Sequence, residues 1–298
     1  MLTTFDQLID RAKTHSGARV AVAAAQDREV LEAVKMALEM GMGKFTLVGD
    51  EPQVRAICRE LAIDMSSVQF INEAEPAKAA RIAVAEVSSG RANILMKGLV
   101  PTADFLRAVL DKEIGLRTGR LLSHVALFRS PRYDRFFYLT DGAMLVAPTL
   151  EQKVQIIQNT VDVAHKLGND NPKVACVAAV EVVNPEMPET LDAAALAKMG
   201  DRRQIKGCTI DGPLGLDNAV SEESARHKGV AGQVAGHADI LLAPDIAAGN
   251  AIYKTMVYFG DIDSAAIVTG ARAPIVLTSR SDSPRARMLS LALAIVTA

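Results

Sequence analysis

Short apolar runs that alternate with helical stretches are the feature that most limits how this chain can fold. In the first part of the chain, strand-like runs lie at 19–25, 44–48, 68–71 and 93–96, and helical patterns separate them. A strand that is apolar along its whole length must be covered on both faces, which is typical of a parallel sheet flanked by helices. The sequence therefore predicts an α/β fold.

The alternation is interrupted once and then resumes. Segments 123–128 and 135–139 flank a turn-rich stretch, RSPRYD, and this spacing predicts an antiparallel hairpin. Thr149 then has Gln152 three residues further on, which is the pattern of a capping box at the start of a helix. Helices and strands alternate again as far as residue 268.

Two domains are predicted from the length and from this interruption. A chain of 298 residues exceeds the roughly 100–200 residues of one domain. We place the domain change near residues 140–150. The predicted first α/β domain is 1–142 plus 283–298, and the predicted second α/β domain is 143–282.

The composition excludes several classes of protein. The net charge is −2 and there is no Trp, which argues against a nucleic-acid surface, since such surfaces need basic and often aromatic side chains. The N-terminus carries acids early and has no apolar region, so it is not a secretory signal. No run approaches the ~18 apolar residues of a membrane span, so no membrane partner is expected. The three cysteines are far apart and predict no disulfide framework, which favours a reducing, cytoplasmic location.

Common nucleotide and metal motifs are absent from the sequence. GMGK at 41–44 lacks the spacing of a phosphate-binding loop, and no GxGxxG follows the first strand. His227 and His237 are isolated, whereas metal ligands normally cluster in threes or fours. We expect no metal site.

A serine-rich corner, VLTSRSDSPRAR, lies at 276–287. Ser283 can cap a helix whose first residue is the following proline. The amino end of that helix would then point at Ser279, Arg280 and Ser281, and a helix amino terminus with an arginine and hydroxyls can bind an anion. A plain Ser-Pro cap beside a solvated arginine explains the same spacing equally well.

Similar corners follow three other predicted strands. They carry Lys97 in NILMKG, Asp211 in DGPLGLDN, and Asp245 and Asn250 in PDIAAGN. Each corner alone is weak evidence, since Gly, Pro and Asp suit any turn. Ligands of open α/β sheets gather at the carboxyl ends of strands, so together the corners indicate a cleft for an anionic small molecule.

Long segments of this chain resemble the phosphate acetyl/butyryltransferase family, especially its butyryltransferase branch, and the resemblance covers nearly the whole chain. The segments that carry it are VLTSRSDS preceded by GARAP, NILMKGLVPTADFLR, APTLEQK, TIDGPLGLDNA and ADILLAPDIAAGNAIYK.

The resemblance implies two α/β domains around an interdomain cleft, similar to isocitrate and isopropylmalate dehydrogenases. It implies a homodimer or higher homo-oligomer, with acyl-CoA and phosphate as the small-molecule partners. The implied reaction is acyl-CoA + phosphate ⇌ acyl phosphate + CoA, with butyryl-CoA as the acyl donor. Coenzyme A is a substrate there, so we expect no cofactor.

The resemblance also implies roles for individual residues. Ser279 and Arg280 match residues that line the CoA and phosphate site, and Arg120 matches an arginine that contacts phosphate. Asp282 is expected mainly to orient Arg280, and these corner residues form the predicted catalytic set. The predicted substrate-binding residues are Lys97, Thr102, Arg120, Asp211, Asp245, Asn250, Ser281 and Ser283.

Two departures from the family put the general base in doubt. The acetyltransferases carry a carboxylate seven residues beyond the serine, and here that position is Ala286. They also carry a cysteine where this chain has Gly142. Asp282 is the nearest carboxylate, but a helix amino terminus and Arg280 favour its charged form and make it a poor base. Thiolate formation can instead rely on those positive charges.

Three alternative functions stay open. The first is a phosphate acetyltransferase that uses acetyl-CoA. The second is a non-catalytic homologue that binds acyl-CoA, which the departures at Ala286 and Gly142 favour. The third is an NAD-dependent decarboxylating dehydrogenase, although its metal site needs clustered aspartates and the candidates here are scattered: Asp211, Asp217, Asp245 and Asp261.

Overall fold

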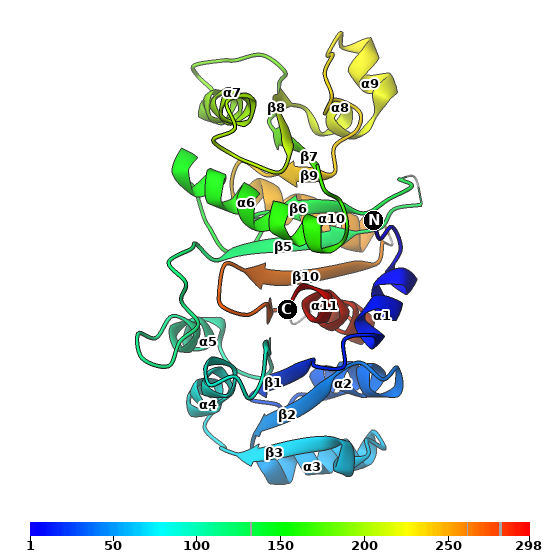
Figure 1. The fold of residues 1–298 in the computed structure, drawn as a ribbon, viewed down its shortest axis with the longest axis vertical. Coiled ribbons are helices and arrows are strands. Elements are labelled where there is room, and N and C mark those ends of the chain that lie inside the picture. The colour runs from blue at the N-terminus through cyan, green and yellow to red at the C-terminus, as the bar shows by residue number, and fades with distance from the viewer. Residues whose placement is uncertain (132, 261, 280–281) are drawn as a thin grey trace. The chain divides into compact units, whose positions relative to one another are not determined.

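The computed structural model describes every residue of the chain except 132, 261, 280 and 281, and the chain divides into two compact units. The terminal unit comprises Phe5–Arg120 and Ala265–Ala298. The central unit comprises Met1–Thr4 and Leu121–Ser264. Each unit has a sheet with helices packed on it, which confirms the predicted α/β fold (Figure 1).

The sheet of the terminal unit is mainly parallel. Its strand order is β3-β2-β1-β4-β11-β10. Neighbouring strands are parallel from β3 to β11, and β10 is antiparallel to β11. The strands are Arg19–Ala23 (β1), Lys44–Gly49 (β2), Val68–Asn72 (β3), Ile94–Lys97 (β4), Ser264–Thr269 (β10) and Ile275–Val276 (β11).

Helices cover both faces of this sheet. Helix α11 packs against α1 and α2, and Figure 1 shows these three on the side opposite to α4 and α5. Helix α3 packs on β2 and β3 near the edge of the sheet. The helices are Phe5–Lys13 (α1), Arg28–Glu39 (α2), Glu51–Glu60 (α3), Pro76–Ser88 (α4), Thr102–Val109 (α5) and Pro284–Thr297 (α11), with a 3₁₀ turn at Met65–Ser67.

Helix α11 is the centre of the apolar core on its face of the terminal unit. Residues 288–297 are all buried, on every side of the helix. A helix that is apolar all round is stable only when it is enclosed, and α1 and α2 enclose this one together with β11. The predicted cap is confirmed, because Ser283 precedes the helix and Pro284 is its first residue.

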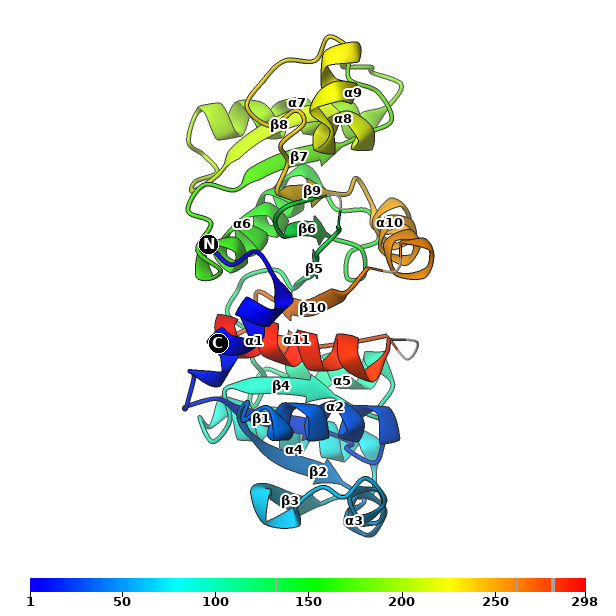
Figure 2. The same ribbon diagram turned by 90° about the vertical axis from the view of Figure 1, so that its right-hand side faces the viewer.

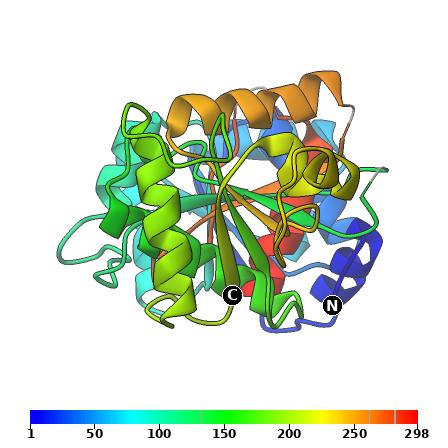
Figure 3. The ribbon, with the colours of Figure 1, turned by 90° about the horizontal axis from the view of Figure 1, so that it is seen from above.

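In the central unit the strand order is β5-β6-β9-β7-β8, and the strands run in mixed directions. Strands β5 and β6 form the predicted antiparallel hairpin, and β6, β9, β7 and β8 are parallel. The strands fan out when seen from above (Figure 3), which is the normal twist of such sheets. The strands are Ser123–Phe128 (β5), Phe137–Thr140 (β6), Lys173–Val177 (β7), Thr209–Leu214 (β8) and Ile240–Leu242 (β9).

Helices also cover both faces of the central sheet. Helices α6 and α7 lie on one face and α10 on the other (Figure 2). The predicted capping box is confirmed, because Thr149 and Gln152 exchange side-chain and backbone hydrogen bonds at the start of α6. No helix among the described residues combines the length and the hydropathy of a membrane span. The helices are Leu150–Lys166 (α6), Pro188–Asp201 (α7), Leu216–Val220 (α8), Glu222–His227 (α9) and Ile246–Phe259 (α10).

The structure draws the boundaries between units elsewhere than the sequence did. Segment 121–142 was assigned to the first domain, but it carries β6, which pairs with β9 of the central sheet. Segment 265–282 was assigned to the second domain, but it carries β11, which pairs with β4 of the terminal sheet. The reason is that strand pairing joins segments far apart in the chain, and an interruption in the helix–strand alternation does not reveal which strands pair.

Candidate active site

The carboxyl ends of β1, β4 and β11 form one edge of the terminal sheet, and they bring two of the predicted corners together. The three strands are parallel and in register, with Lys97 opposite Ala23 and Met96 opposite Val276. The chain therefore leaves β4 at Lys97 and leaves β11 toward Ser279 on the same side. The predicted gathering of polar residues at a strand-end edge is observed for these two corners.

The Ser279 corner is a closed turn. The Ser279 amide N–H donates to Oδ2 of Asp282 at 2.7 Å, and the Asp282 amide N–H donates back to the Ser279 carbonyl oxygen at 3.1 Å. Ser283 then caps α11 by accepting the Ala286 amide at 3.1 Å. The two predicted site residues between them, Arg280 and Ser281, lie outside the described residues.

The Asp282 carboxylate holds this turn in place. Its side chain is 7% exposed and already accepts the Ser279 amide. A buried carboxylate that accepts a backbone amide in this way is a structural acceptor. Its hydrogen bond links Asp282 to Ser279, whereas its expected action on Arg280 stays a prediction.

Sequence reasoning missed one residue of this corner. Arg287, on the first turns of α11, is buried and its guanidinium reaches back to the carbonyl oxygens of Ser279 and Asp282. Its ion-pair partner is Glu29, near the start of α2. The signal in the sequence was the second of two arginines, Arg285 and Arg287, which directly precedes the apolar run MLSLALAIV, where a buried charge needs a partner.

The Lys97 corner brings the chain very close to β1. Lys97 is half-buried, and its Nζ donates to the carbonyl oxygen of the next residue, Gly98, at 3.3 Å. The amides of Gly98 and Leu99 donate to the carbonyl oxygens of Ala23 and Ala24, each at 2.8 Å. Only a residue without a Cβ fits at position 98, because a Cβ would meet those same carbonyl groups.

Two helices begin at this edge, so it is electropositive. Thr102 is exposed at the first position of α5, and α11 begins just after the Ser279 corner. The unpaired N–H groups at a helix start and the helix dipole attract anions. The ammonium of Lys97 adds a positive charge to the same edge.

Arg120 is not held at the same edge. The Arg120 amide donates to Oγ1 of Thr118, and that hydroxyl donates to the carbonyl oxygen of Gly270 at 2.6 Å. Gly270 follows β10, which is antiparallel to β11, so it lies at the amino ends of the parallel strands. The Arg120 backbone is thus tied near the edge opposite to Lys97 and Ser279.

In the central unit, the predicted Asp211 and Asn250 do not lie in strand-end loops. Asp211 lies inside β8, which continues to Leu214, and its Oδ1 accepts the next amide, that of Gly212. Because β8 is an edge strand, the strand can pass through Pro213, which has no N–H to donate. Asn250 lies inside α10, which begins at Ile246, directly after Asp245.

Asp245 and Asn250 have structural partners in the central unit. The Asp245 carboxylate caps α10 by accepting the Ala248 amide at 2.8 Å. The Asn250 amide nitrogen donates to the carbonyl oxygen of Gly142 at 3.2 Å, so it joins α10 to the segment after β6. Both residues thus shape the carboxyl end of the central sheet.

Asp141, directly after β6, is a second residue that sequence reasoning missed. The side chain is buried, and Oδ1 accepts the amides of Ala143 and Met144 at 2.8 and 2.9 Å. Its other oxygen, Oδ2, has no hydrogen-bond partner among the described residues. Burial raises the pKa of this carboxyl, whereas the backbone donors lower it. A buried carboxyl of this kind is a candidate proton acceptor beside Gly142, where the family's cysteine is missing.

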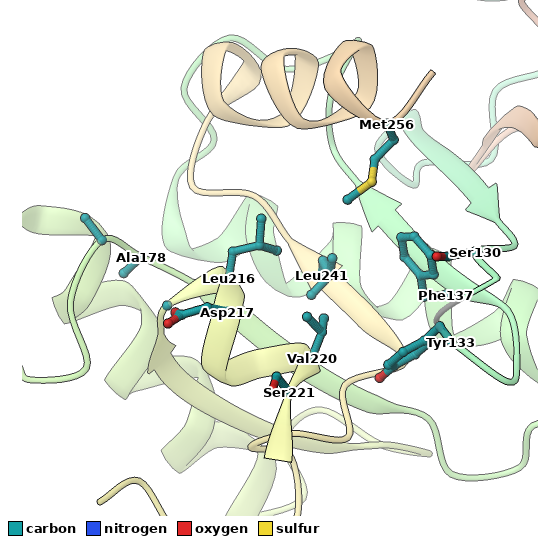
Figure 4. A pocket seen from close by; sticks show the side chains of 12 residues that line it. Ser130, Tyr133, Phe137, Ala178, Leu216, Asp217, Val220, Ser221, Leu241 and Met256 are labelled. Carbon is teal, nitrogen blue, oxygen red and sulfur yellow. The ribbon is translucent and has the colours of Figure 1, made fainter. Parts of the chain in front are cut away.

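A cavity of about 840 Å³ lies in the central unit between α8, α10 and the sheet. Figure 4 shows Met256 pointing from α10 toward Leu241 and Val220, so the lining is largely apolar. Sites for small organic ligands have this size and character. The sequence did not predict the cavity, since its lining comes from six separate segments. These residues are Ser130, Tyr133, Phe137, Ala178, Ala179, Gly215, Leu216, Asp217, Val220, Ser221, Leu241 and Met256.

Comparison with known proteins gives one consistent answer. The family described as Phosphate acetyl/butaryl transferase matches residues 3–80 and 73–295. A phosphate butyryltransferase of Clostridium acetobutylicum is 51% identical over 298 residues, which is all of this chain and 99% of that protein. A phosphate acetyltransferase of Thermotoga maritima is 44% identical, covering 98% of this chain and 99% of that protein.

A solved structure agrees with these relatives. The crystal structure of a branched-chain phosphotransacylase from Enterococcus faecalis V583 matches with a TM-score of 0.85 and 35% sequence identity. The match covers 94% of this chain and 98% of that one. The likeness therefore extends through both units.

Proposed function

Because the chain belongs to the phosphate acetyl/butyryl transferase family, we propose that it transfers a short-chain acyl group between coenzyme A and inorganic phosphate. The observation that supports this most directly is the electropositive edge of the terminal sheet, where Lys97 and the starts of α5 and α11 meet. Phosphate groups occur in both substrates and in both products, so a site for phosphate oxygens is what the reaction requires.

The chemical step is an acyl substitution. In the direction of acyl-CoA formation, the CoA thiolate attacks the carbonyl carbon of the acyl phosphate. A carbon–sulfur bond forms, the carbon–oxygen bond to phosphorus breaks, and phosphate leaves with the electron pair. In the reverse direction a phosphate oxygen attacks the thioester and CoA leaves as the thiolate, which then takes up a proton.

We assign the corner residues to the charge that develops in this step. Ser279 and Arg280 stabilise the tetrahedral oxyanion, and Lys97 binds the phosphate. Arg120 has no part in this assignment, because its backbone is tied near the opposite edge of the sheet. Removal of one such donor typically lowers the rate by roughly 10²–10³-fold. We therefore expect Arg280→Ala to lower turnover by about that factor with the fold intact, and near-normal turnover would contradict the assignment.

The CoA thiol must lose its proton before it attacks the acyl phosphate. Ala286 cannot accept it, and Asp282 is engaged by the Ser279 amide. Thiolate formation by electrostatic stabilisation at the cationic corner is our proposal.

The preferred acyl group is butyryl in this proposal. Relatives named phosphate butyryltransferase support that choice, whereas the acetyltransferase of Thermotoga maritima keeps acetyl-CoA as the alternative. An interdomain cleft, a homodimer, a cytoplasmic location and the independence from any cofactor stay predictions.

One assay separates the proposed function from its alternatives. Acetyl-, butyryl- and isobutyryl-CoA are each mixed with phosphate, and free thiol is followed with and without phosphate. Phosphate-dependent release supports the proposal, and its rates rank the acyl groups. Binding of acyl-CoA without release identifies a non-catalytic homologue. NADH formed with NAD and Mg²⁺ in place of phosphate identifies a dehydrogenase.

A further inference from the structure

A buried guanidinium lies directly beneath the Ser279 corner. The Arg287 residue is 4% exposed. Its Nε donates to the carbonyl oxygen of Asp282 at 3.1 Å, and its Nη2 donates to the carbonyl oxygen of Ser279 at 3.2 Å. One rigid, planar group thus binds two carbonyl oxygens that are three residues apart in the chain.

Those two carbonyls belong to the residues on either side of 280 and 281. Arg287 therefore fixes the backbone of Ser279, the described residue of this corner that the proposed function assigns to the substrates. The Ser279 amide and the Asp282 carboxylate close the same turn from the other side at 2.7 Å. The corner is therefore held by one side chain from within the turn and by another from within α11.

The charge of Arg287 is balanced by a residue from a different helix. Glu29 Oε2 lies 2.6 Å from Nη2, and the Glu29 side chain is 52% exposed. A buried charge without a partner is costly, so this pair makes burial of the guanidinium possible. Glu29 lies in the first turn of α2, after the carboxyl end of β1, so the pair joins two strand-end segments of the terminal sheet.

We propose that Arg287 is a positioning residue that presets the Ser279–Asp282 corner for the phosphate-bearing substrates and that Glu29 holds its guanidinium. The proposal rests on the proposed function of the corner. Arg287 itself touches no substrate in this scheme, and it acts through the two backbone carbonyls.

The test compares Arg287→Met, which removes the donors but keeps a long apolar side chain, with two further variants. Arg287→Lys keeps the charge near Glu29 but cannot bind both carbonyls as a fork, so it should recover part of the activity. Arg19→Met is the matched control. Arg19 also binds two backbone carbonyls, of Gly90 and Arg91, but it does so at the amino end of β1.

We expect Arg287→Met to lower kcat/KM for phosphate-dependent thiol release by roughly 10–100-fold, because misplacement of reacting groups by about 1 Å costs that much. Arg19→Met should keep the normal value. Both variants are assayed without urea, at a temperature well below the midpoint of their thermal unfolding. A loss of stability is then not mistaken for a loss of positioning. Wild-type kcat/KM in folded Arg287→Met would overturn the proposal.

Backbone hydrogen exchange gives a readout that does not depend on activity. Peptides that span residues 277–284 should exchange faster in Arg287→Met than in the wild type, and at the normal rate in Arg19→Met. Glu29→Gln should give a smaller increase in the same peptides. If the wild type shows no thiol release, the proposed function fails, while the exchange result still decides whether Arg287 fixes the corner. Unchanged exchange in Arg287→Met overturns the proposal.

Discussion

The close contact between Gly98 and β1 makes a sharp prediction for Gly98→Ala. A Cβ at this position would lie 2.7 Å from the carbonyl oxygen of Ala23 and nearer still to that of Ala24. Both atoms belong to the backbone of a buried segment, so no side-chain rotation can relieve the overlap. The loop after β4 must move away from β1, which strains the two hydrogen bonds that the amides of Gly98 and Leu99 make there.

The expected loss of stability follows from these two effects. Overpacking of a filled site costs about 1–3 kcal/mol. Weakening two backbone hydrogen bonds adds about 0.5–1.5 kcal/mol each. The sum is roughly 2–6 kcal/mol, and with a urea m-value of about 2 kcal/mol/M the unfolding midpoint should fall by roughly 1–3 M. Turnover should fall as well, since the displaced loop carries Lys97.

Gly17→Ala provides the control within the same unit. A Cβ at Gly17 meets no atom within 4 Å, and its backbone is not in the left-handed region. Its free energy of unfolding should stay within about 0.5 kcal/mol of the wild-type value, so its urea midpoint should hardly change. Equal midpoints for Gly98→Ala and Gly17→Ala would refute the reasoning from backbone contact.

Two further predictions concern the cap of α11 and a buried histidine. Ser283→Ala removes the acceptor of the Ala286 amide, so the free energy of unfolding measured in urea should fall by about 1 kcal/mol. Ser283→Asp should restore it, because an aspartate can also cap a helix. An unchanged free energy of unfolding in Ser283→Ala would show that the cap is dispensable. Burial lowers the pKa of His124 to about 4, whereas a histidine in the unfolded chain has a pKa of about 6.5. As the pH falls from 6.5 toward 4, the unfolded chain binds a proton at this side chain and the folded protein does not, so the free energy of unfolding falls. The wild type should therefore lose about 2 kcal/mol more than His124→Phe between pH 7 and pH 5, as measured by urea unfolding, and parallel pH profiles would count against this account.

Local patterns in the sequence predicted many helices and strands, because the residues that favour each of these elements lie within the element or next to it. Strands such as β1 and β5 are continuous apolar runs, and the start of α6 was readable because Thr149 and Gln152 lie at the spacing that a capping box needs. The Ser283 cap of α11 was readable in the same way. These signals act over a few residues, so no knowledge of the fold is required to recognise them.

Features that depend on partners distant in the chain could not be read in this way. Glu29 and Arg287 are 258 residues apart, and nothing local indicates that they meet. Asp211 looked like a turn residue, but pairing with β7 keeps it inside β8. The role of Gly98 was equally hidden, because a Lys-Gly pair after a strand is ordinary until the approach to β1 is seen.

The division of the chain between the two units has a consequence for how the protein is made. A ribosome would deliver nearly the whole central unit, 121–264, as one uninterrupted stretch, whereas β11 and α11 emerge only afterwards. Until then α1 and α2 lack the helix that they pack against and β4 lacks its neighbour β11, and nascent chains with such uncovered apolar surfaces are prone to aggregate. Residues 1–264 expressed alone should therefore bind chaperones. Addition of residues 265–298 as a separate peptide should restore folding of the terminal unit.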